Sequence, residues 1–90
     1  MKIRAHIYVS GRVQGVFFRS RTRDEAIKYD IRGWAQNLPD ERVEIICEGE
    51  KKNVDRLIEF CKIGPTLAKV DKVEIIWEDY KSEFENFKIR

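Results

Sequence analysis

The chain has 90 residues, of which 42% are hydrophobic and 38% are charged, with a net charge of +2. No apolar run approaches the roughly 20 residues that cross a membrane. Charges interrupt the short apolar run at the N-terminus, and no small-residue cleavage site follows it, so we expect no secretion signal there. We therefore expect a single cytoplasmic domain over residues 1–90.

The charge is unevenly distributed along the chain. The first 23 residues hold six basic side chains and no acid, and the remaining residues hold twelve basic and sixteen acidic ones. An acidic body with a basic N-terminal quarter indicates a local anion site rather than a surface that coats nucleic acid.

Alternating and helical patterns divide the chain into short elements. Apolar side chains alternate with polar ones in three segments, and two other segments carry an apolar stripe at helical spacing. In chain order, the patterns predict a strand over residues 2–10, a helix over 20–30, strands over 33–37 and 42–48, a helix that Gly64 and Pro65 end, a strand over 70–78 and a short tail strand within 84–89.

This order is β-α-β-β-α-β with an added tail strand. Two similar split halves of this kind are typical of an α+β ferredoxin-like sandwich. We therefore predict an antiparallel sheet with both helices on one face and a more open second face.

One stretch, SGRVQGVFFRSRTR from Ser10 to Arg23, joins the first strand to the first helix. A strand, a loop containing Gly11 and Gly15, and a helix N-terminus together favour binding of an oxyanion, because loop and first-turn N–H groups can converge on it. A plain strand–helix turn is an equally good explanation of the two glycines alone.

Arginines in this stretch favour the anion site. Arg19, Arg21 and Arg23 are expected in the first helical turn, where each cation costs roughly 0.3–1 kcal/mol at low salt. A bound anion would compensate this charge. Arg19 lies nearest the loop and presents a planar fork to phosphate or carboxylate, whereas Arg12, Arg21 and Arg23 are expected to form a solvated rim that steers anions.

Several motifs resemble the acylphosphatase family in order along nearly the whole chain. The run VSGRVQGVFFR from Val9 to Arg19 is similar to the family's first signature, and GWAQNLPD from Gly33 to Asp40 is similar to its second. The ending Phe87 to Arg90 also resembles the family's usual ending.

The resemblance implies a ferredoxin-like fold and metal-free hydrolysis of carboxyl-phosphate mixed anhydrides, with no cofactor. It implies that Arg19 binds the substrate and that Asn37 orients the attacking water. The implied phosphate cradle comprises Gln14, Gly15, Val16, Phe17, Phe18 and Arg19. Since the first two strands are expected to run parallel, Arg19 and Asn37 should emerge at the same end of the sheet.

Three positions depart from the family's usual pattern. Phe17, Asp30 and Glu41 stand where the family commonly has glycine or, at position 17, another small residue. Asp tolerates a left-handed backbone better than most residues, whereas Glu41 is expected to alter its tight turn. Phe17 adds bulk beside the cradle and is expected to affect access or acyl preference.

The remaining reactive side chains indicate no further chemistry. His6, the single histidine, is expected on the polar surface of the first strand, and Cys47 and Cys61 are expected to be buried free thiols. One histidine and two separated cysteines cannot form a zinc site.

Two alternative functions stay open. One is a noncatalytic anion-binding or regulatory module, and the other is an RNA-binding module that uses an aromatic sheet face. Acids on that face, Glu44 and Glu74 among them, oppose RNA. We expect a small acyl phosphate as partner, no nucleic acid, no membrane, and a monomer.

Overall fold

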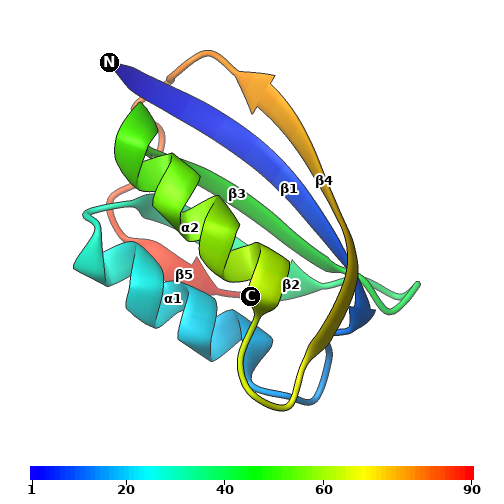
Figure 1. The fold of residues 1–90 in the computed structure, drawn as a ribbon. Helices are drawn as coiled ribbons and strands as arrows, with labels where there is room; N and C mark the ends of the chain where they lie inside the picture. Colours follow the sequence, from blue (N-terminus) through cyan, green and yellow to red (C-terminus); the bar gives the residue numbers. More distant parts are fainter.

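The computed structural model describes residues 1–90 as two helices packed on one face of a five-stranded sheet (Figure 1). This arrangement confirms the predicted ferredoxin-like sandwich. No helix in it is both long enough and apolar enough to traverse a bilayer. The elements are β1 (Lys2–Arg12), α1 (Phe18–Lys28), β2 (Arg32–Asn37), β3 (Val43–Glu50), α2 (Lys51–Ile63), β4 (Lys69–Glu78) and β5 (Phe87–Ile89).

The strands lie in the order β4-β1-β3-β2-β5. Because β1 and β2 both pair antiparallel with β3, they run parallel to each other and end at the same edge of the sheet. The predicted antiparallel sheet is right for these three strands and β4 but wrong for β5, which pairs parallel with β2. The sheet is mixed because the chain crosses from β4 at one edge to β5 at the other and enters β5 in the direction of β2.

The core lies between the sheet and the two helices. Alternate residues of β1 and β3 are fully buried there, as their period of two predicts, and they meet the apolar stripe of α2. Cys47 and Cys61 are both buried and free, as predicted. Burial raises the pKa of the Cys47 thiol to about 12, so this thiol is a small hydrophobic side chain at neutral pH.

Helix α1 begins at Phe18, two residues earlier than the sequence pattern predicts. Phe17 precedes it with a left-handed backbone, φ 66°, and this conformation turns the loop directly into the helix. Arg19 and Arg21 lie in the first turn, which holds no acid, but Arg23 lies in the second turn and its predicted place was wrong. Asp30 takes φ 54° after the helix, in the left-handed region where the family's glycine is expected.

A buried ion pair anchors the connection between β4 and β5 to the open face of the sheet. Arg4 and Glu48 are only 7% and 3% exposed, and 3.8 Å separates Arg4 Nη1 from Glu48 Oε2. The Glu48 carboxylate accepts the main-chain N–H groups of Lys81 at 2.6 Å and Glu83 at 3.0 Å. These hydrogen bonds hold the connection across the strands on its way to β5.

His6 lies on the polar face of β1, as predicted, where it is half-buried in a polar network. Its Nε2 lies 2.6 Å from Glu44 Oε2, and Gln36 donates to Glu44 Oε1 at 2.6 Å. Burial raises the pKa of the Glu44 carboxyl, but the hydrogen bonds from Gln36 and His6 outweigh it, and the net pKa is lowered. No residue of this network lines the cavity described below.

Candidate functional site

A cavity of about 330 Å³ lies where β1 and β2 end and α1 begins. The elements around it are distant in sequence and meet because β1 and β2 run parallel. Its lining combines loop, helix and strand residues: Val13, Gly15, Phe17, Phe18, Arg19, Ser20, Asn37 and Ile89.

The loop between β1 and α1 contributes Gly15 and Phe17 to this cavity and contains main-chain N–H groups without a main-chain partner. Gly15 has φ +73° and Phe17 has φ 66°, so two left-handed residues curl the loop. A Cβ on Gly15 would meet no atom within 4 Å, so the backbone angle alone favours glycine there. None of the main-chain N–H groups from Gly15 to Ser20 donates to a main-chain carbonyl. Such an array at a helix N-terminus carries partial positive charge and suits an anion.

Arg19 lines the cavity from the first turn of α1 and is half-buried. Its Nη1 donates to the main-chain oxygen of Arg90 at 3.0 Å. This contact comes from the residue after β5, and it restrains the guanidinium while other N–H donors of the fork stay available.

Asn37 is the last residue of β2 and lines the same cavity from the end of that strand. Its side chain is exposed. An amide both donates and accepts hydrogen bonds, so it can hold a water molecule in a defined orientation. The structure thus brings Arg19 and Asn37 to one cavity.

Gln14 does not line the cavity. Its side-chain amide donates to the main-chain oxygens of Leu38 at 2.8 Å and Arg42 at 2.9 Å. Those carbonyls belong to the turn after Asn37, which is also closed by hydrogen bonds from Leu38 N to Arg42 O and from Glu41 N to Leu38 O. The Gln14 side chain therefore ties the loop before α1 to the turn after β2.

The turn after β2 is further fixed by Asp40. Its carboxylate accepts the Arg42 main-chain N–H at 3.2 Å and the Arg42 Nε–H at 2.8 Å. The main-chain hydrogen bond, with the side-chain contact, lowers the pKa of the Asp40 carboxyl. Glu41 takes φ 75°, so the turn keeps a left-handed shape that glycine would adopt at no cost, contrary to the expected alteration.

Sequence reasoning missed three residues of the lining. Val13 and Ile89 supply apolar walls, and the Ser20 hydroxyl, which donates to Phe17 O at 3.1 Å, lies at the rim. Ser20 directly follows Arg19 in the first helical turn, a position that signals proximity to a helix-terminus site. Val16, which the sequence assigned to the cradle, is buried and lines a neighbouring hollow instead.

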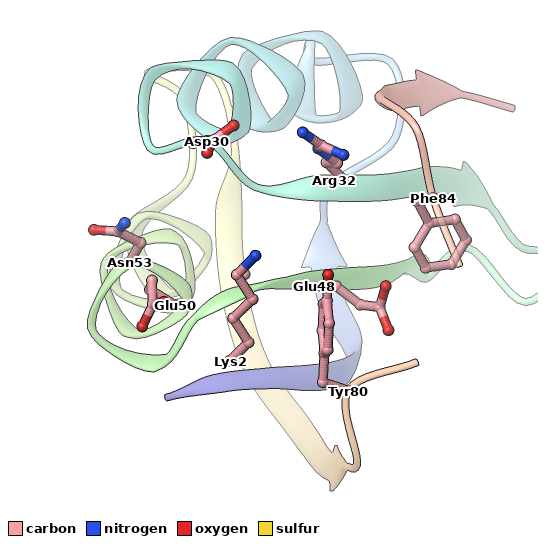
Figure 2. Close-up of a pocket in the computed structure, with 9 residues that line it drawn as sticks. Lys2, Asp30, Arg32, Glu48, Glu50, Asn53, Tyr80 and Phe84 are labelled. Carbon is pink, nitrogen blue, oxygen red and sulfur yellow. The ribbon is translucent and has the colours of Figure 1, made fainter. Parts of the chain in front are cut away.

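A smaller cavity of about 90 Å³ lies at the opposite end of the sheet (Figure 2). Lys2, Glu48 and Arg32 come to it from three neighbouring strands, and Tyr80 and Phe84 come from the connection before β5. Because the Glu48 carboxylate is already bonded to main-chain N–H groups, this cavity is part of the structural anchor of that connection.

The lining of the larger cavity suits an anion. Its polar side chains are a guanidinium, a hydroxyl and an amide, and it holds no carboxylate, imidazole or thiol. No group of three or more His, Cys, Asp or Glu side chains with metal-binding geometry occurs in residues 1–90. Fixed N–H donors around a small cavity can stabilise negative charge on phosphoryl or carboxyl oxygens.

Comparisons with known proteins agree with this geometry. The acylphosphatase family model matches residues 5–89. An acylphosphatase of Pyrobaculum islandicum is 48% identical over 88 residues, which cover 97% of this chain and 93% of that protein.

Solved structures are also similar to this chain along its length. The crystal structure of acylphosphatase from Bacillus subtilis superposes with a TM-score of 0.94 at 34% identity and 98% coverage of each chain. Full-length HypF, in a phosphate- and nucleotide-bound form, contains a region with a TM-score of 0.87 at 29% identity, which covers all of this chain and 12% of HypF. The chain belongs to the acylphosphatase family.

Proposed function

We propose that this protein hydrolyses carboxyl-phosphate mixed anhydrides to a carboxylate and inorganic phosphate. The observation that carries the proposal is the meeting of three features at one cavity: the segment from Phe17 to Ser20, whose main-chain N–H groups have no main-chain partner, the guanidinium of Arg19 and the amide of Asn37. Membership of the acylphosphatase family supports the substrate class.

The loop and Arg19 bind the phosphoryl group. Charge in the transition state of phosphoryl transfer is spread over the three equatorial oxygens. N–H donors that are fixed in advance stabilise this charge without reorganising during the reaction. The hydrogen bond from Arg19 to the Arg90 main-chain oxygen supports such fixing.

Asn37 orients the attacking water. An acyl phosphate already has a good leaving group, so the site needs to place a water in line rather than generate a strong nucleophile. The water oxygen attacks phosphorus as the bond from phosphorus to the acyl oxygen breaks, and the carboxylate leaves with the electron pair. With no carboxylate or imidazole in the lining, a phosphoryl oxygen accepts the water proton, which balances the step as carboxylate and dihydrogen phosphate.

The polar lining supports a metal-independent reaction, because arginine, serine and asparagine side chains favour an anion over a hard cation. Phosphate release from acetyl phosphate, followed with and without EDTA, tests this directly. We expect equal rates in both conditions. Loss of activity in EDTA would contradict metal independence, and absence of turnover at micromolar protein would contradict the enzymatic function.

Two substitutions separate the proposed roles. Arg19→Ala should lower kcat/KM by roughly 10²–10³-fold and abolish competitive inhibition by inorganic phosphate. Asn37→Ala should lower kcat while phosphate still inhibits. Matched controls are Arg56→Ala on the exposed face of α2 and Asn86→Ala in the connection before β5, neither of which lines the cavity.

The alternatives predict other outcomes. A noncatalytic anion-binding module would bind inorganic phosphate through Arg19 but release none from any acyl phosphate. If Asn37→Ala folds normally and yet loses phosphate binding, Asn37 acts in the cradle and its role as water ligand is wrong.

A further inference from the structure

Strand β4 (Lys69–Glu78) forms one edge of the sheet, and no strand pairs with its outer side (Figure 1). Its only partner is β1, so the main-chain N–H and C=O groups of alternate β4 residues face outward from the sheet. The other edge strand, β5, has only three residues. Of the two edges, β4 therefore offers the longer template for pairing with another strand.

Apolar side chains are exposed beside this free edge. The side chains that β4 directs toward the helices include Val73, Ile75 and Trp77. Those on the open face include Lys72, Glu74, Ile76 and Glu78. Ile76 is 52% exposed and Trp77 is 43% exposed, so each face of the sheet shows apolar area next to unpaired main-chain groups. Such a surface is favourable for contact with another chain.

The protection of this edge is confined to one end of the strand. Natural sheets commonly protect an edge with a bulge, a proline or charged side chains. In the pairing with β1, Ser10 lies opposite Lys72 and Gly11 lies opposite Val70, so Asp71 is a bulge. The stretch from Lys72 to Glu78 is regular and contains no proline. Its charges remain as the only protection against another strand.

These charges complement a second copy of the same stretch. Two β4 strands that pair antiparallel are related by a two-fold axis perpendicular to the sheet, and directly opposite side chains share a face. With the axis at Ile75, Lys72 lies opposite Glu78 of the second copy, and the symmetry makes this ion pair twice. On the helix side, Val73 lies opposite Trp77 of the second copy. Opposite charges and apolar pairs at such positions stabilise a strand pair.

The neighbouring registers are less favourable. An axis at Glu74 places two glutamates opposite each other, and an axis at Ile76 places Glu74 opposite Glu78 twice. Like charges at directly opposite positions destabilise a strand pair. An axis at Val73 brings the bulge at Asp71 into the paired stretch. Charge and regular backbone geometry together select the register centred on residue 75.

We propose that β4 is an interface between two copies of this chain, which join their five-stranded sheets into one continuous sheet with residue 75 at the two-fold axis. This inference replaces the monomer that the sequence alone leads us to expect, and it does not depend on the proposed hydrolysis. A single strand pair is small beside a standard interface of about 1,600 Å². The dimer should therefore be weak, with a Kd of about 10–100 µM.

Sedimentation equilibrium of the whole chain from about 5 to about 500 µM tests this interface. The mean mass of the wild type should rise from that of one chain toward that of two. Ile76 allows a test by charge sign, because it lies opposite Glu74 of the second copy. Ile76→Lys should dimerise at least about tenfold more tightly than Ile76→Glu. The matched controls Ile63→Lys and Ile63→Glu, at a position 76% exposed at the end of α2, should both keep the wild-type Kd.

Disulfide formation tests the register separately. A mixture of Glu74→Cys and Ile76→Cys chains should form mixed disulfide dimers faster than either variant alone, because these two positions lie opposite each other only in the proposed register. Cys47 and Cys61 are buried and do not compete. Far-ultraviolet circular dichroism checks that each variant is folded, as expected for substitutions at exposed positions.

Three results would overturn the proposal. The first is a wild type that keeps the mass of one chain at about 500 µM, which would leave β4 free for a different partner. The second is an equal Kd for Ile76→Lys and Ile76→Glu, which would place the interface elsewhere. The third is equal cross-linking in the mixture and in the separate cysteine variants, which would exclude the register centred on residue 75.

Discussion

Replacing Gln14 by methionine would cut the link between the phosphate loop and the strand that carries Asn37. Methionine keeps the length of the side chain and removes its amide, which donates to the carbonyls of Leu38 and Arg42 at 2.8 and 2.9 Å. Both carbonyls keep the turn hydrogen bonds they also accept, from Glu41 and Leu38. The substitution therefore loosens the junction without unfolding the turn.

Gln14→Met should lower both the free energy of unfolding and kcat. Two neutral hydrogen bonds contribute about 1 kcal/mol each, so the free energy of unfolding should fall by about 2 kcal/mol. For a chain of this length, such a loss lowers Tm by roughly 8–16 °C. A displacement of about 1 Å between the phosphoryl group and the water held by Asn37 lowers kcat by up to about 10²-fold.

Urea unfolding and acetyl phosphate hydrolysis measure these effects separately. Gln36→Met is the matched control, because it loses the hydrogen bond from Gln36 to Glu44 on the open face and leaves the cavity intact. We expect it to lose stability but not kcat. In an Asn37→Ala background, Gln14→Met should cost no further activity, because the residue it positions is gone.

Two results would refute this reasoning. If Gln14→Met loses about 2 kcal/mol and keeps kcat within about twofold, the clamp stabilises the fold and does not position the water. If the loss of kcat is equally large with and without Asn37, Gln14 acts through the phosphate loop instead.

Two further predictions concern stability. Glu41 has a φ of 75°, a left-handed backbone that costs a residue with a Cβ about 1–2 kcal/mol. Glu41→Gly relieves this strain at an entropic cost, so it should raise the free energy of unfolding by about 0.5–1 kcal/mol in urea titrations. An equal gain from Glu41→Ala would mean that charge, not backbone strain, is relieved. Glu44 has a lowered pKa because hydrogen bonds from Gln36 and His6 outweigh the effect of burial, so its stabilisation is complete above the ordinary glutamate pKa and is lost as pH falls through the lowered one. Glu44→Gln should therefore be less stable than wild type at pH 7, with a difference that shrinks in acid unfolding titrations; a constant difference down to pH 2 would contradict this.

Periodicity predicted the layers of the fold because burial on one face constrains every second residue of a strand. Ile7 in β1 and Ile45 in β3 are both fully buried, as their alternation requires. The parallel course of β1 and β2 follows from the helix between them. The expectation that Arg19 and Asn37 meet was therefore a consequence of topology, and the structure has both side chains at one cavity.

Other features depend on long-range contacts that leave no local pattern. The Gln14 amide finds its acceptors across 24 and 28 residues, and nothing in the spacing of the motif separates a side chain that faces the ligand from one that faces a turn. Alternation predicts Glu48 as one more polar residue on the open face of the sheet, yet it is buried under the connection before β5. The early start of α1 depends on the left-handed backbone of Phe17, which phenylalanine rarely adopts.

The three-residue strand β5 should undock before the rest of the domain unfolds. This strand is held by β2 on one side only, and its undocking exposes chiefly Phe87, at about 1.5–3 kcal/mol, against about 5–15 kcal/mol for a whole domain. The same event removes Ile89 from the cavity wall and the Arg90 oxygen from Arg19. On heating, catalysis should therefore fade while the far-ultraviolet signal of the remaining sheet and helices is still native, and the gap between the two midpoints measures how firmly this edge is docked.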